Sequence, residues 1–146
     1  MKILVIGENG QLGRSIKNIF SDIQLNNEDE FVFIGRKELD LSNEESISLY
    51  LNDNFFEIIV NCAGYTFVDK AESEEDLAYQ INHLAVGKIA EISNKQKVKL
   101  IHISTDYIFD GFNEKAYLES DDPSPLNIYG KSKLAGEVAV CEAMQK

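Results

Sequence analysis

The sequence reads MKILVIGENGQLGRSIKNIF over residues 1–20, and this stretch decides the class of fold. Residues 3–6 form a short apolar run of the kind found in buried strands, and apolar residues recur at helical spacing over 12–20. A glycine-rich turn at 7–13 lies between them. A strand, a glycine-rich turn and a helix in this order predict the first unit of a parallel α/β sheet.

The rest of the chain repeats this alternation of short apolar runs with helical patterns. We expect further strands at Phe31–Ile34, Ile58–Val60 and Val98–Ser104, and a short one at Asp40–Leu41. We expect helices from Asn43 to Leu51 and from Glu72 to Asn94. After a long loop over 106–127, we expect a last helix that Asn127 caps and that runs toward the C-terminus. The predicted fold class is α/β: a Rossmann-like doubly wound parallel sheet with helices on both faces, truncated before its last strands.

The composition is that of a globular protein, with 44% hydrophobic and 27% charged residues in 146. A formal net charge of −11 argues against a nucleic-acid or anionic-membrane partner. No apolar stretch approaches the roughly 18 residues of a membrane span or resembles a signal peptide. Cys62 and Cys141 match no disulfide or metal spacing, and His83 and His102 have no ligand-spaced partners. We therefore expect a cytoplasmic protein with reduced thiols and assign no metal.

The glycines of the first turn, Gly7, Gly10 and Gly13, are spaced GxxGxxG. Between a strand and a helix, they allow a pyrophosphate to approach the helix N-terminus, although a purely structural turn is the alternative. Arg36 and Lys37 follow the second strand, where an acidic residue would bind the ribose 2′-hydroxyl of NAD. Basic residues there suit a 2′-phosphate, so NADP(H) is favoured and NAD(H) is the alternative.

A tyrosine and a lysine, Tyr129 and Lys133, stand four residues apart on the predicted last helix and so share one face. The Lys133 ammonium, and the positive end of the helix, would favour the phenolate form of Tyr129. The hydroxyl of Thr105, at the end of the last predicted strand, could hold a carbonyl against that phenol. Hydride chemistry on a ketone or alcohol needs these parts. Asp106 beside Thr105 is either a substrate contact or a structural hydrogen-bond partner.

Six segments together give a family resemblance that spans nearly the whole chain. They are GENGQLG (7–13), DLSN (40–43), IIVNCAGYTFVDKAESE (58–74), INHLAV (81–86), STDYIFDG (104–111) and YLESDDPSPLNIYGKSKLAGE (117–137). The chain resembles the dTDP-4-dehydrorhamnose reductase family, the RmlD-like extended short-chain dehydrogenases/reductases. Gly64 stands where alanine is usual in that family, and Ser15 stands where an acidic residue could have supported magnesium.

The resemblance implies a catalytic set and a cofactor site. The implied catalytic residues are Thr105, which polarises the carbonyl, Tyr129, which gives its proton to the substrate oxygen, and Lys133, which lowers the tyrosine pKa and binds the nicotinamide ribose. The implied cofactor contacts are Gly7, Gly10, Gln11, Leu12 and Gly13 at the pyrophosphate, Asp40 and Leu41 near the adenine, Ala63, Gly64 and Tyr65 at the middle, and Ser104, Tyr129 and Lys133, with Arg36 added by the basic-residue argument. Thr105 and Asp106 would face the sugar of a nucleotide-sugar substrate.

The implied reaction is reduction of dTDP-4-dehydro-6-deoxy-L-mannose to dTDP-L-rhamnose, with residues 1–146 as the NAD(P)-binding Rossmann domain. In this family a C-terminal half completes the sheet and the sugar pocket, so activity of the chain alone stays open. Two alternatives remain: a reductase of another nucleotide-linked 4-keto sugar, and a non-catalytic dinucleotide-binding module like the regulatory subunit of methionine adenosyltransferase. An unfinished sheet edge could also recruit a second copy to form a homodimer.

Overall fold

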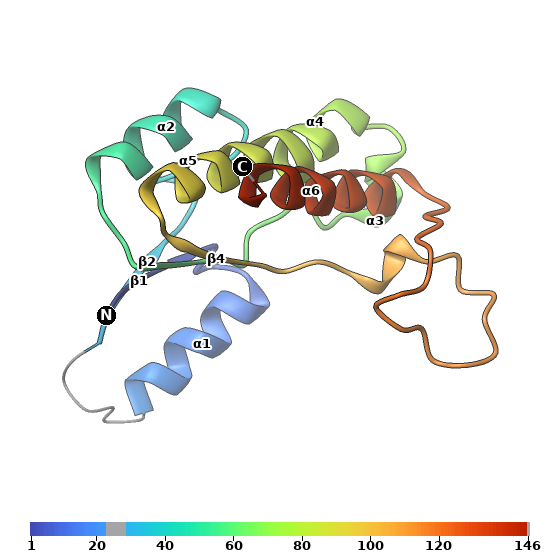
Figure 1. Ribbon diagram of the computed structural model, residues 1–146, viewed down its shortest axis with the longest axis horizontal. Helices are drawn as coiled ribbons and strands as arrows, with labels where there is room; N and C mark the ends of the chain where they lie inside the picture. Colours follow the sequence, from blue (N-terminus) through green and yellow to red (C-terminus); the bar gives the residue numbers. More distant parts are fainter. Residues whose placement is uncertain (23–28, 146) are drawn as a thin grey trace.

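The computed structural model describes residues 1–22 and 29–145, and these form a sheet between two layers of helices (Figure 1). The strands are β1 (Lys2–Ile6), β2 (Glu30–Ile34), β3 (Ile58–Asn61) and β4 (Lys99–His102). All pairings are parallel and the order is β2-β1-β3-β4. The helical segments are α1 (Gln11–Asp22), α2 (Glu44–Asp53), α3 (Val68–Ala71), α4 (Glu75–Tyr79), the π-helical η1 (Gln80–Leu84), α5 (Ala85–Gln96), the 3₁₀ turn η2 (Asp106–Ile108) and α6 (Ile128–Met144).

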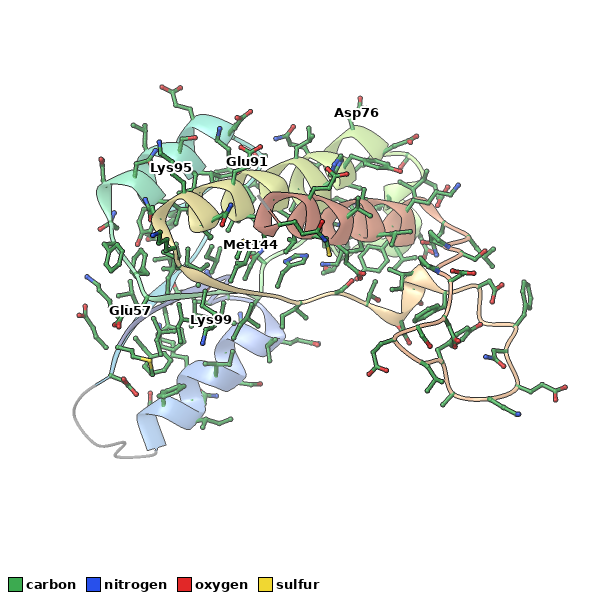
Figure 2. All side chains as sticks on the ribbon, viewed as in Figure 1. Glu57, Asp76, Glu91, Lys95, Lys99 and Met144 are labelled. Atoms are coloured by element: carbon green, nitrogen blue, oxygen red, sulfur yellow. The ribbon has the colours of Figure 1, made fainter. Side chains whose placement is uncertain are left out.

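Helices cover both faces of the sheet, which confirms the predicted doubly wound class. Figure 1 shows α1 on one face, and α2, α5 and α6 on the other. Side chains fill the space between the sheet and these helices (Figure 2). The central strand β1 is almost continuously buried, with Leu4 and Val5 at 0% exposure, as expected for a strand covered on both faces. Ile47 and Leu51 of α2 and Ile89 of α5 close the core on one face.

The prediction of a short strand at Asp40–Leu41 is wrong, because this segment lies in a turn. The Asp40 carboxylate accepts hydrogen bonds from the backbone N–H and the hydroxyl of Ser42, at 2.9 and 2.7 Å. The backbone N–H of Asp40 donates to Ser46 Oγ at 3.1 Å. These local bonds occupy the backbone N–H groups of Asp40 and Ser42, which a strand would use to pair with its neighbour. An apolar residue beside an acid therefore does not suffice to predict a strand here.

The prediction of a single helix over 72–94 is also wrong in detail. The helical stretch begins at Glu75 and runs to Gln96, and the π-helical segment η1 interrupts it. Asn82 in η1 is fully buried and bonds to the backbone of Tyr65, donating to its carbonyl oxygen and accepting from its N–H. The last strand stops at His102 rather than Ser104. The predicted capping of the last helix is confirmed: Asn127 Oδ1 accepts from Gly130 N–H at 2.7 Å.

Candidate active site

A cleft of about 910 Å³ opens at the carboxyl ends of the strands, which is where parallel sheets bind ligands. It is lined by residues from the turns that follow β1, β2 and β3. The predicted cofactor residues that line it are Gly7, Gly10, Gln11, Leu12, Arg36, Asp40, Leu41, Ala63, Gly64 and Tyr65. Three separate sequence motifs therefore meet in one cavity.

The glycine turn brings the backbone of three segments together. Gly7 has φ +95°, a left-handed conformation that favours glycine, and a Cβ there would lie 2.8 Å from the backbone nitrogen of Ala63. Gly13 does not line the cleft; a Cβ on it would overlap the carbonyl oxygen of Gly7. The glycine turn therefore packs directly against the first turn of α1. The free backbone N–H groups of that first turn lie at the end of the helix that borders the cleft. Such a helix N-terminus favours a phosphate.

Arg36 borders the cleft just after β2 and is anchored along one edge. Its Nε lies 3.4 Å from Asp40 Oδ1, and its Nη2 donates to Ser42 Oγ at 3.5 Å. Burial would raise the pKa of Asp40, but hydrogen bonds from Ser42 and the charge of Arg36 together hold it below its ordinary value. Asp40 is therefore an anion at neutral pH that orients Arg36, whose side chain is 74% exposed.

Tyr129 lies in the first turn of α6, at the positive end of the helix. Its ring packs edge-on against Tyr107 of η2, with centroids 5.5 Å apart, and it contacts a small buried cluster that includes Tyr65. Lys133, one turn later, is only 5% exposed and its Nζ donates to the carbonyl oxygen of Ile103 at 2.6 Å. The helix thus holds both side chains against the segment that leaves β4.

Thr105 belongs to that same segment and caps η2. Its Oγ1 accepts from Tyr107 N–H and donates to Asp106 Oδ1, both at 3.3 Å. Ser104 donates a hydrogen bond to Glu137 of α6. The cleft is not lined by Ser104, Thr105, Tyr129 or Lys133. It is lined by Tyr65, which belongs to the buried cluster against which Tyr129 packs. The structure therefore gives two adjoining parts: the cleft and the junction of β4 with α6.

Tyr65 is a second tyrosine near this part of the site, in the buried cluster against which Tyr129 packs. The Tyr65 hydroxyl donates to Glu74 Oε2 at 2.6 Å. Burial, together with this bond and the charge of Glu74, raises the pKa of Tyr65 to about 12. Its proton is committed to Glu74, so Tyr65 is unsuited to donate it to a substrate near neutral pH.

Sequence reasoning missed several polar residues at this junction, of which Asn61, Asn82 and Ser132 are buried and His102 is partly buried. Asn82 Nδ2 donates to Ser132 Oγ of α6 at 3.0 Å, which ties η1 to the helix of Tyr129. Asn61 and His102 occupy paired positions on β3 and β4. Their signal in the sequence is a polar residue at the end of an apolar strand or within a helix. Such a residue needs a hydrogen-bond partner when buried, but the sequence does not identify the partner.

Comparison with known proteins gives consistent relatives. A dTDP-4-dehydrorhamnose reductase of Sinorhizobium fredii is 39% identical over 143 residues, which is 98% of this chain and 47% of the relative. The crystal structure of a dTDP-4-dehydrorhamnose reductase from Clostridium acetobutylicum is similar with a TM-score of 0.92 and 36% identity, covering 100% of this chain and 51% of that one. The crystal structure of the Bacillus anthracis dTDP-4-dehydrorhamnose reductase in complex with NADP is similar with a TM-score of 0.88 and 39% identity. The match covers 97% of this chain and 49% of that one.

The chain spans about half the length of the relatives it matches. The family model described as the RmlD substrate binding domain matches residues 1–146. A match over the whole chain, together with these relatives, shows that the chain belongs to the RmlD family.

Proposed function

We propose that this chain supplies the NADPH-binding domain and the catalytic Thr105, Tyr129 and Lys133 of a reductase that converts dTDP-4-dehydrorhamnose to dTDP-L-rhamnose. The observation that carries the proposal is the pairing of a glycine-walled cleft with a helix that presents a tyrosine and a lysine one turn apart. The names of the relatives support the sugar substrate, and the NADP complex of the Bacillus anthracis relative supports the cofactor.

The residues of the cleft fit a dinucleotide. Its volume of about 910 Å³ lies in the range of roughly 300–1,000 Å³ typical of ligand sites. At one end, the N-terminus of α1 and the close approach of Gly7 to Ala63 leave backbone where a pyrophosphate would lie. At the other, Arg36 offers a guanidinium held in place by Asp40. A phosphate on the adenine ribose would gain a charge-assisted partner there, which favours NADP(H) over NAD(H).

Three side chains at the junction of β4 and α6 would transfer the proton and stabilise the charges that develop in the reaction. NADPH, when bound, supplies the hydride. Tyr129 gives its phenolic proton to the substrate oxygen, and the positive end of α6 with the Lys133 ammonium favours the phenolate that is left. Thr105 can turn its hydroxyl from Asp106 to a carbonyl oxygen, since that bond is long at 3.3 Å. Asp106, which is exposed beside it, is available to a sugar hydroxyl.

A small nucleotide-sugar substrate calls for neither nucleic acid nor a membrane as partner, and the net charge of −11 disfavours both. None of the helices in residues 1–22 and 29–145 combines the length and apolarity needed to cross a bilayer. We propose a cytoplasmic location and retain a homodimer as the oligomeric hypothesis.

A chimera tests the proposal most directly, because the chain spans half of its relatives. Residues 1–146 would replace the matching half of the Clostridium acetobutylicum reductase, and NADPH oxidation would be followed with dTDP-4-dehydrorhamnose. We expect turnover, and in Tyr129→Phe a fall in kcat by about 10²–10⁴-fold with NADPH affinity unchanged. The matched control Tyr79→Phe, altered in α4, should retain activity. A folded, NADPH-binding chimera without turnover, or one in which Tyr129→Phe is as active as the parent, would contradict the proposal.

A further inference from the structure

Three polar side chains form a row from the sheet to the catalytic helix: Asn61 on β3, His102 on β4 and Lys133 on α6. Asn61 and His102 are neighbours in the register of the two strands. Asn61 Nδ2 lies 3.2 Å from His102 Nδ1, and His102 Nε2 lies 3.4 Å from Lys133 Nζ. Asn61 is 1% exposed and Lys133 5% exposed, so each depends on protein partners rather than on water.

The direction of the hydrogen bonds in this row follows from one backbone amide. The N–H of Ala63 can only donate, and it meets Asn61 Oδ1 at 3.1 Å. The Asn61 amide nitrogen therefore faces His102, and because an NH₂ group only donates, His102 Nδ1 must accept. A neutral imidazole carries one proton, so that proton is on Nε2. Burial, with the nearby charge of Lys133, lowers the pKa of His102 to about 4, so the ring is neutral at neutral pH.

This tautomer directs the Nε2–H group at the amino group of Lys133. An ammonium group only donates, so two donors meet when Lys133 is charged, whereas an uncharged amine could accept the imidazole proton. The other partner of Nζ, the carbonyl oxygen of Ile103 at 2.6 Å, can accept from either form.

Two titratable groups are seen to act on Lys133 from the elements around it. His102 faces it from β4, and Glu137 stands one turn further along α6. Burial lowers the pKa of Lys133, while the charge of Glu137 opposes this change. Of the other elements packed on α6, η1 contributes the uncharged Asn82, which is bonded to Ser132, and η2 contributes Tyr107, which contacts Tyr129. The uncharged Ala71, Ala78 and Gly87 contribute contacts from α3, α4 and α5. A carboxylate, that of Glu72 at the end of α3, accepts from the backbone N–H of Ile128 at the start of α6, at 2.8 Å.

We propose that Asn61 and His102 are positioning residues for Lys133: they hold the imidazole N–H toward Nζ and thereby set the pH above which the lysine loses its charge. Since the charged lysine favours the phenolate of Tyr129, the pair sets the upper pH limit of reductase activity. This catalytic consequence rests on the proposed function. The tautomer of His102 and the titration of Lys133 are independent of the proposed function.

The tautomer can be measured in the unmodified chain by ¹H–¹⁵N NMR of the imidazole nitrogens. The sequence has two histidines, so His83→Gln assigns the remaining signals to His102. We expect His102 to stay neutral with its proton on Nε2 between about pH 5 and 8. A proton on Nδ1, or a ring that becomes charged near its ordinary pKa of about 6.5, would overturn the proposal.

The titration of Lys133 can be followed by ¹³C NMR of labelled lysine, with Lys133→Met for assignment. In His102→Gln the amide can turn its oxygen to Nζ, and in Asn61→Ala the imidazole can move its proton to Nδ1 and accept through Nε2. Both should raise the titration midpoint of Lys133 by about one pH unit, as one charge-assisted hydrogen bond would. The control His83→Gln should leave it unchanged. An unchanged midpoint in either variant, when folded, would overturn the proposal.

The activity readout separates this inference from the proposed function. In the active chimera, His102→Gln should shift the alkaline limb of the pH–kcat profile upward by the same amount as the Lys133 midpoint. A folded, NADPH-binding chimera without activity, together with the expected NMR results, would refute the proposed function alone. An active chimera whose alkaline limb does not move in His102→Gln would overturn the role of His102.

Discussion

Arg36 is the residue to which we assign the preference for NADPH. Its guanidinium lies beside Asp40 and Ser42, which hold it at the border of the cleft. From the sequence, we placed this basic residue directly after the second strand, beside the cofactor. The sequence did not predict that Asp40, expected near the adenine, would also contact this arginine, because that contact requires the turn found in place of the expected strand at Asp40–Leu41.

Replacing Arg36 with glutamine should reduce the preference for NADPH over NADH by about tenfold or more, since a hydrogen bond to a charged group contributes about 1.5–3 kcal/mol. Calorimetric titration with each cofactor measures this ratio. Arg14→Gln removes the same charge from an exposed position on α1 and should leave the ratio unchanged. If Arg36→Gln weakens both cofactors equally, the guanidinium does not recognise a 2′-phosphate.

His102 should also make stability depend on pH. Its pKa is lowered from 6.5 to about 4 in the folded chain, chiefly by burial. Between these values the unfolded chain binds a proton at this residue and the folded chain does not, so stability falls as pH falls through this window. Urea unfolding at several pH values should show a shallower fall in His102→Gln than in the parent. His83→Gln should keep the parental slope; equal slopes in His102→Gln and parent would show that His102 is not held neutral.

At the scale of elements, α6 is positioned by close contacts that a sequence pattern does not reveal. Its start was predicted from Asn127, because capping is a local property of the chain. The interruption of the helix over 72–94 by η1 was not predicted, because it accompanies contacts of Asn82 with Tyr65 and with Ser132, 17 and 50 residues away in sequence. Gly136 lets α6 approach the backbone of Asn82.

Gly136→Ala should destabilise the chain by about 1–3 kcal/mol, since its Cβ would overlap the carbonyl oxygen of Asn82 and force α6 away from η1. The midpoint of urea unfolding measures this loss. Val138→Ala, on the exposed side of the same helix, should change stability by no more than about 0.5 kcal/mol. Wild-type stability in Gly136→Ala would mean that α6 has room to move.

At the scale of the whole molecule, the fold class followed from the sequence because strand and helix periodicities are local and their alternation leaves few topologies. The meeting of three motifs in one cleft also followed, since parallel strands present their carboxyl ends at one edge. The row from Asn61 through His102 to Lys133 did not follow, because it depends on strand register and on the packing of α6. Local pattern thus predicts the framework, while buried polar contacts require the structure.

The most direct test of the central claim is calorimetric titration of this chain with NADPH and, separately, with NADH. We predict saturable binding at one site, with NADPH bound more tightly. The absence of binding by a chain that circular dichroism shows to be folded would contradict the claim that residues 1–146 form a dinucleotide-binding domain.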